Sequence, residues 1–171
     1  MIIWINGSFG SGKTSTAKAL TLQLKDSYLY DPEEAGFFIR DNIPNTLEKN
    51  DFQDFEIWRD INYRMLKFLD ANHTGPIIVP MTLVNQMYFD EIINKLVNEG
   101  IDVRHFSLIA KKETLIKRLS LRGDQKNPWI LDKIDNCIES LNRSCFDTHI
   151  HTDNKITNEV VIEILSLIKQ A

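Results

Sequence analysis

"GSFGSGKT", residues 7–14, follows the short apolar run "IIWIN" (2–6) and opens a helical pattern. It matches G-x-x-x-x-G-K-[S/T], a loop in which glycines let the backbone wrap an anion and helix-start N–H groups add positive potential. We expect Lys13 to reach the outer phosphates of a nucleotide and Thr14 to offer its hydroxyl to Mg²⁺. A solvated glycine-serine turn is the alternative, and the strand-to-helix context disfavours it. The predicted nucleotide-binding residues of this loop are Gly7, Ser8, Phe9, Gly10, Ser11, Gly12, Lys13 and Thr14.

Apolar runs alternate with helical patterns along the whole chain, and this alternation predicts the fold class. The expected strands are 2–6, 27–31, 76–82, 102–110 and 148–152. The expected helices include 13–24, 51–71, 89–100, 111–122, 129–142 and 158–170. Strands that are separated by helices need right-handed crossovers, which produce a mainly parallel sheet covered on both faces. We therefore expect one domain, residues 1–171, with a three-layer α/β fold.

The charge and the apolar runs of the chain limit the kinds of partner that the protein can have. The chain has 171 residues, a net charge of -4 and acidic and basic residues mixed along its length. This mixture argues against nucleic acid as the main partner. No apolar run approaches the roughly 18–20 residues that span a bilayer, and the first ten residues lack the regions of a signal peptide. We therefore predict a cytoplasmic protein with no transmembrane segment.

Asp31 ends the second expected strand in "YDPEE" (30–34). Aspartate before proline and two glutamates is a typical helix N-cap. A carboxylate at this strand end, beside the loop, is also placed to orient or deprotonate an acceptor hydroxyl. The two roles are held equally open, because one carboxylate can serve both.

Arg118 and Arg122 are four residues apart in "KRLSLRGDQKNP" (117–128), so they share one face of a helix. Such a pair can clamp phosphates and neutralise charge during phosphoryl transfer. A solvated basic helix face is the alternative. No carboxylate ends the strand 76–82, where motors and GTPases usually hold Mg²⁺.

Several blocks spread along the chain carry a family resemblance: "IIWINGSFGSGKT", "YDPE", "IIVPMT", "KETLIKRL" and "HIHTDN". With these blocks the chain resembles the small P-loop kinases, such as nucleoside monophosphate, shikimate, gluconate and chloramphenicol kinases, and more closely the bacterial tunicamycin resistance proteins. The resemblance implies a five-stranded parallel sheet in the order 2-3-1-4-5 and a lid at about residues 123–129. It also implies ATP and Mg²⁺ as cofactors, Arg118 over the nucleotide base, Arg122 on phosphate, and Asp153 and Asn154 near the base.

The region between the second and third strands, about residues 32–72, is where small kinases place the acceptor pocket. Its candidate substrate-binding residues are Arg40, Arg59, Asn62 and Tyr63. On the helix 51–71, Phe55, Trp58 and Met65 are expected to form the apolar stripe, and Arg59 and Tyr63 share a different face. For each polar residue, substrate contact and a plain surface role are equally open.

Two functions follow from these observations. The first is an ATP-dependent kinase for a hydroxyl of a sugar- or nucleoside-like compound, with tunicamycin or a relative as the suggested acceptor. Its catalytic residues would be Lys13, Asp31, Arg118 and Arg122. The alternative is a nucleotide-dependent protein that sequesters an antibiotic without modifying it, favoured by the missing acid after strand 76–82.

Overall fold

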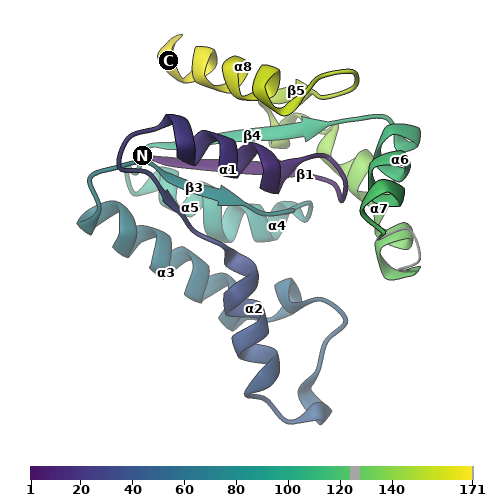
Figure 1. Ribbon diagram of the computed structural model, residues 1–171. Helices are drawn as coiled ribbons and strands as arrows, with labels where there is room; N and C mark the ends of the chain where they lie inside the picture. The colour runs from purple at the N-terminus through teal and green to yellow at the C-terminus, as the bar shows by residue number, and fades with distance from the viewer. Residues whose placement is uncertain (124–127, 171) are drawn as a thin grey trace.

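A five-stranded parallel sheet forms the centre of the protein (Figure 1). The computed structural model describes residues 1–123 and 128–170. The strands are β1 (Ile2–Gly7), β2 (Tyr28–Leu29), β3 (Ile77–Pro80), β4 (Val103–Ile109) and β5 (His149–His151). They lie in the order β2-β3-β1-β4-β5, and each neighbouring pair is parallel. The predicted strand order is therefore confirmed.

Helices cover both faces of this sheet. They are α1 (Lys13–Gln23), α2 (Pro32–Asp41), α3 (Glu56–Asn72), α4 (Gln86–Phe89), α5 (Lys95–Asn98), α6 (Lys112–Arg122), α7 (Pro128–Leu141) and α8 (Thr157–Gln170). Shorter turns are η1 (Asn45–Leu47), η2 (Phe52–Asp54), η5 (Ser144–Phe146) and the π-helical turn η3 (Asp90–Asn94), which joins α4 to α5. Figure 1 shows α1 and α8 on one side of the sheet and α3, α4 and α5 on the other. The three-layer α/β fold is confirmed.

Alternate side chains of β1 supply the two halves of the core. Ile2 and Trp4 pack with α3, η3 and α5, whereas Ile3 and Ile5 pack with α1 and α8. All four are fully buried, because a central parallel strand is apolar on both faces. The indole Nε1 of Trp4 donates to the Met81 carbonyl at 3.2 Å, so its one polar atom is satisfied. β1 is thereby fixed in the middle of the sheet, directly before the glycine-rich loop.

The helix predicted over 51–71 differs from the structure in two respects. The chain first forms the turn η2, and α3 begins only at Glu56. The predicted stripe is wrong at Met65, which is 40% exposed, whereas Arg59, Asn62 and Tyr63 lie with Trp58 and Leu66 on the buried face. These three polar side chains tolerate burial because each has a hydrogen-bond partner.

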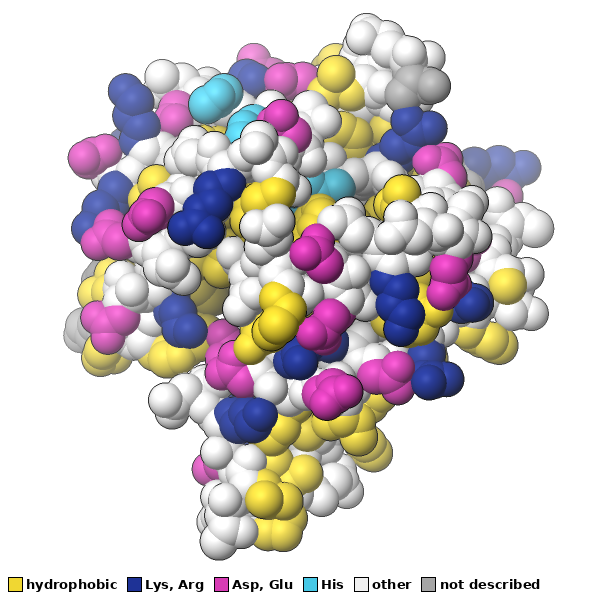
Figure 2. All heavy atoms as spheres, turned by 180° about the vertical axis from the view of Figure 1, so that it is seen from behind, with side chains coloured by type: hydrophobic (Ala, Val, Ile, Leu, Met, Phe, Trp, Pro, Cys, Tyr) yellow, Lys and Arg dark blue, Asp and Glu magenta, His cyan; other side chains and the backbone are white. Residues whose placement is uncertain are grey.

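The segment from α2 to η2 projects from the body of the molecule (Figure 1). Its exposed apolar side chains include Phe37, Phe38 and Leu47. Figure 2 shows hydrophobic side chains gathered on a projecting part of the surface, while Lys and Arg alternate with Asp and Glu elsewhere on that face. Within residues 1–123 and 128–170, no helix combines the length and the apolar character that crossing a membrane requires.

Candidate active site

The loop between β1 and α1 has a backbone that only glycine allows at two positions. Gly10 and Gly12 have φ angles of +77° and +99°, in the left-handed region. A Cβ on Gly10 would lie 2.9 Å from the carbonyl oxygen of Leu115 in α6. The loop therefore turns tightly against α6 and directs the chain into α1, which is the geometry of a phosphate-binding loop.

Polar groups inside the loop fit an anion. The Ser11 hydroxyl is buried and has no hydrogen-bond partner among the residues that the structure describes. The Lys13 ammonium donates to the Ser8 carbonyl at 3.1 Å, and burial lowers the pKa of Lys13 to about 8. A desolvated ammonium and a buried hydroxyl that lacks a partner are both stabilised by a phosphate group. Thr14 is exposed in the first turn of α1, where its hydroxyl is open to a metal ion.

A cavity of about 400 Å³ lies on the α6 side of the loop. We call it the arginine cavity, because both arginines of α6 line it. Its lining residues are Gly10, Ser11, Gly12, Ser15, Thr16, Arg118, Leu121, Arg122, Thr152, Lys155, Ile156, Thr157 and Val160. Arg118 donates from Nη2 to the Thr152 carbonyl at 2.7 Å, which ties α6 to the end of β5. The structure thus brings the predicted arginine pair to the loop; their roles toward base and phosphate stay predictions.

The other two residues that were predicted at the base do not line this cavity. Asp153 accepts from the Thr114 hydroxyl at 2.6 Å and from the Lys111 N–H at 3.1 Å, and these bonds lower the pKa of Asp153. Asn154 is exposed and has a φ of +59°. Both therefore shape the turn after β5, and their contact with a base remains a prediction.

A second cavity, also of about 400 Å³, is open to the Phe9 side of the loop. We call it the aromatic cavity, because four of its lining residues have aromatic side chains. Its lining residues are Phe9, Glu33, Phe37, Arg40, Asn50, Asp51, Phe52, Gln53, Met81, Thr82, Val84, Trp129, Lys133, Asn136 and Cys137. They come from the loop, α2, η2, the chain after β3 and α7. Apolar rings beside a few polar groups are typical of a small-molecule site.

Glu33, and not Asp31, is the carboxylate of α2 that lines the aromatic cavity. Desolvation raises the pKa of Glu33, the neighbouring Asp31 raises it further, and Lys13 opposes both. Asp31 is exposed and accepts from the Glu33 N–H at 3.0 Å, so its predicted N-cap role is confirmed. Sequence reasoning missed Glu33 because the helix dipole already explains glutamates in a first turn. An acceptor role for Asp31 remains a prediction.

Only one of the four predicted acceptor residues lines the aromatic cavity. Arg40 does so, with its guanidinium carbon 5.6 Å from the centre of the Phe52 ring. Asn62 accepts from the Tyr30 hydroxyl at 2.7 Å, and the Tyr63 hydroxyl donates to Glu99 at 2.5 Å. Arg59 is bonded to Glu91. These three side chains are held within the packing around α3, outside the cavity lining.

Three further observations concern the predicted Mg²⁺ site and the predicted lid. The chain after β3 carries Met81 and Thr82 in place of an acid, and the Thr82 hydroxyl donates to the Gly7 carbonyl at 2.8 Å. No cluster of three or more His, Cys, Asp or Glu occurs in the part of the chain that the structure describes. The predicted lid, about residues 123–129, falls largely on 124–127, outside the described residues.

Comparison with known proteins agrees with this geometry. A "Nucleotide-binding protein" of Chromobacterium violaceum is 29% identical over 119 residues, which are 70% of this chain but only 34% of that protein. The Deinococcus radiodurans tunicamycin resistance protein is 29% identical, with a TM-score of 0.82 over 98% of this chain and 95% of that chain. A gluconokinase of Sinorhizobium meliloti shares the fold at 18% identity and a TM-score of 0.69, covering 98% and 91% of the two chains.

The similarity to the tunicamycin resistance protein extends over nearly the whole of both chains, so it includes the regions around both cavities. The sequence signature of the AAA domain family matches residues 3–141, which carry the glycine-rich loop, the α2 to α3 region and α6. The fold is that of the small P-loop kinases. The chain therefore belongs to the AAA domain family of P-loop proteins.

Proposed function

We propose that the protein is an ATP-dependent kinase that transfers a phosphoryl group to a hydroxyl of a small molecule. The observation that carries the proposal is the placement of the two cavities. They share no lining residue, yet Phe9 lines one and Gly10, Ser11 and Gly12 line the other, so both open on the same loop. Direct transfer needs a donor and an acceptor held on either side of such a loop.

The residues divide the work as follows. Loop N–H groups and Lys13 hold the outer phosphates, and Arg122 stabilises charge that develops on the transferred group. Glu33 accepts the proton of the acceptor hydroxyl. At the same time the oxygen of that hydroxyl forms a bond to the γ-phosphorus of ATP, and the bond from this phosphorus to the leaving ADP breaks. A raised pKa suits this task, because a stronger base takes the proton more readily. Thr14 would be one ligand of Mg²⁺, and bound Mg²⁺ would neutralise negative charge on the phosphates.

The acceptor is proposed from the neighbours and from the walls of the aromatic cavity. A resistance protein for tunicamycin is among the similar structures, as is a kinase for gluconate. The rings of Phe37, Phe52 and Trp129 offer apolar faces, and Glu33 and Arg40 offer polar partners. A sugar- or nucleoside-like compound carries both surfaces, and tunicamycin is the first compound to test. We place this reaction in the cytoplasm.

One observation favours a second function. The chain after β3 has no carboxylate for Mg²⁺, since Met81 and Thr82 occupy that position. A P-loop protein with weak metal binding transfers phosphate poorly, and such a protein can still bind nucleotide and ligand. The alternative is therefore a nucleotide-dependent protein that sequesters its ligand unchanged.

Mass spectrometry of the candidate compounds after incubation with protein and Mg·ATP separates the two functions. The kinase adds one phosphoryl group to the compound, whereas the binder retains the compound unmodified. Lys13→Ala should abolish both phosphorylation of the compound and nucleotide-dependent retention of the compound. The melting temperature should change little. Lys18→Ala, at an exposed position of the same helix, is the matched control and should behave as wild type. Full transfer by Lys13→Ala would contradict the loop assignment itself.

A further inference from the structure

One wall of the aromatic cavity has little regular structure of its own. Residues 51–54, which we call the cavity wall, contain only the three-residue 3₁₀ turn η2. Asp51, Phe52 and Gln53 of this wall line the cavity. A single 3₁₀ turn has weak internal hydrogen bonds, so its position must be fixed by contacts with its surroundings.

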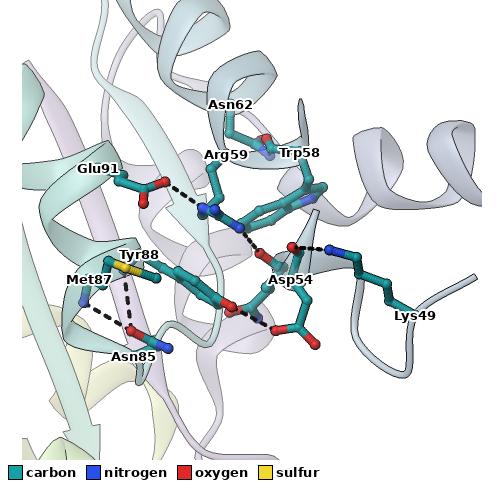
Figure 3. Close-up of polar contacts among 10 residues, drawn as sticks. Lys49, Asp54, Trp58, Arg59, Asn62, Asn85, Met87, Tyr88 and Glu91 are labelled. Carbon is teal, nitrogen blue, oxygen red and sulfur yellow. Dashed lines mark hydrogen bonds and ion pairs between the residues drawn. The ribbon is translucent and has the colours of Figure 1, made fainter. Parts of the chain in front are cut away.

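Arg59 supplies such a contact from the buried face of α3 (Figure 3). Its Nη1 donates to the carbonyl oxygen of Gln53 at 2.6 Å, and its Nε donates to the Glu91 carboxylate at 2.5 Å. The side chain is only 9% exposed. A charged donor that is bonded at two separate nitrogens has one orientation, so the Gln53 backbone is held at a defined place.

The guanidinium is itself held by the helical run that follows β3. Its central carbon lies 4.2 Å from the centre of the Tyr88 ring, and Glu91 lies in the π-helical turn η3. Figure 3 shows the Tyr88 ring and the Glu91 carboxylate approaching Arg59 from this run. π-helical turns occur frequently at functional sites.

Further bonds tie the same wall to the loop. The Tyr88 hydroxyl donates to Asp54 Oδ1 at 2.8 Å. The side-chain amide of Gln53 donates from Nε2 to the Thr82 carbonyl, also at 2.8 Å. Thr82 in turn donates to the carbonyl of Gly7, the first residue of the loop. Gln53 therefore connects the wall to Arg59 through its backbone carbonyl and, by way of Thr82, to the phosphate-binding loop through its side chain.

From these contacts we infer that Arg59 is a positioning residue. It fixes the cavity wall, and thereby the shape of the aromatic cavity, without lining the cavity. The inference rests on the proposed function only in calling the ligand of this cavity an acceptor. It differs from a direct contact, because Arg59 would change acceptor binding through Gln53 and Phe52 rather than through its own charge.

The test compares Arg59→Lys with a matched control on the same helix. Lysine keeps the charge but lacks the planar fork, so it cannot bond Glu91 and Gln53 together while lying on the Tyr88 ring. Arg64→Lys is the control, because Arg64 is an exposed arginine of α3 that pairs with Asp60 at 2.8 Å. Tyr88→Phe is a second variant that removes only the hydroxyl bond to Asp54 and leaves the buried arginine in place.

Hydrogen exchange of the wall amides is the decisive measurement, and it needs no enzymatic activity. The backbone amides of Gln53 and Asp54, and that of the following Phe55, donate to acceptors in the wall, and we call these three the wall amides. In Arg59→Lys they should exchange about tenfold faster, while amides of β1 and α1 change less than about twofold. Tyr88→Phe should accelerate the same amides to a smaller degree, and Arg64→Lys should leave them unchanged. Unchanged wall amides, or equal acceleration throughout the sheet, would overturn the inference.

Kinetics supply a second arm wherever an acceptor is phosphorylated. Arg59→Lys should raise the KM for the acceptor about tenfold and leave the KM for ATP within about twofold, since the wall lines only the aromatic cavity. An equal rise in both KM values would overturn a role that is specific to the wall. If wild type phosphorylates nothing, the proposed function fails, and the exchange measurement still decides the inference about Arg59.

Discussion

At the scale of single residues, two neighbouring carboxylates divide the start of α2 between folding and chemistry. Asp31 accepts from the backbone N–H of Glu33 and so caps the helix. Glu33 faces the aromatic cavity, where desolvation and the charge of Asp31 raise its pKa. The cap therefore positions the residue that faces the ligand and also makes it a stronger base. A sequence pattern that is fully explained by helix capping thus conceals a candidate catalytic group.

This division leads to a comparison of Glu33→Gln with Asp31→Asn. Glutamine cannot accept a proton, so phosphoryl transfer should fall by about 10²–10⁴ while ATP binding is kept. Asparagine caps about as well as aspartate, so Asp31→Asn should keep its stability and lose less activity than Glu33→Gln. Transfer assays, ATP titrations and melting curves check this, with Glu34→Gln as the control, because Glu34 is in the same helix turn and does not line the cavity. A larger loss in Asp31→Asn would return the acceptor role to Asp31.

Lys13 should take up a proton when nucleotide binds. Burial lowers its pKa to about 8, so near that pH the free protein is about half protonated at this site, whereas phosphate favours the full charge. Calorimetry at pH 8 in two buffers of different ionisation enthalpy should show an uptake of about half a proton per nucleotide. Affinity should weaken as the pH rises above this value. Lys13→Arg stays charged and should lose the uptake; an equal uptake in that variant would assign the proton to another group.

At the scale of elements, the sequence predicts the positions of the strands well, but it does not predict the irregular turns η2 and η3. The apolar runs place all five strands to within about two residues, since buried strands are continuous apolar segments. The predicted helix 51–71 includes the turn η2, because no sequence signal separates Asp51 from the apolar pattern that begins at Phe55. The π-helical turn η3 was not predicted either, as one extra residue in a turn leaves no periodic signal. Both irregular elements hold residues of the cavity wall or of its supports.

The close packing of α2 against η2 leads to a prediction for Gly36→Ala. A Cβ at Gly36 would lie 2.5 Å from Cγ of Phe52, and that ring is packed at 5.4 Å from Trp58. Overpacking costs about 1–3 kcal/mol, and the better helix propensity of alanine offsets up to about 1 kcal/mol. We expect a net loss of about 1–2 kcal/mol in urea unfolding.

Phe52→Ala supplies the control for Gly36→Ala, because it removes Cγ and the ring atoms that the new methyl group meets. In that background Gly36→Ala should cost little or stabilise the protein, so the loss of stability in the double mutant should be smaller than the sum of the two single losses. Equal stability of Gly36→Ala and wild type would mean that the ring yields freely. Phe52 would then not form a fixed wall of the cavity.

At the scale of the whole molecule, the strand order explains why two cavities open on one loop. β1 is central, with β3 on one side and β4 on the other; the chain runs from β1 out to β2, returns through β3 and then crosses β1 to reach β4. Ligands of open α/β sheets bind at the carboxyl ends of strands where the order reverses. Here α2, η2 and α7 line the aromatic cavity, whereas α6, the chain after β5 and α8 border the other. The family resemblance implied this strand order, whereas which side chains face each cavity depends on packing and could not be predicted from the sequence.

Separate cavities predict that donor and acceptor are bound at the same time. No residue lines both, so saturating one cavity should leave the other accessible and change the second Kd by less than about tenfold. Phosphoryl transfer should then be sequential, and initial rates measured over a grid of both substrates should give intersecting reciprocal lines. Titration of a non-hydrolysable ATP analogue with and without acceptor checks the binding step directly. Parallel lines would instead require a phosphorylated protein intermediate, with the donor leaving before the acceptor enters, and the two cavities would then have to be occupied in turn.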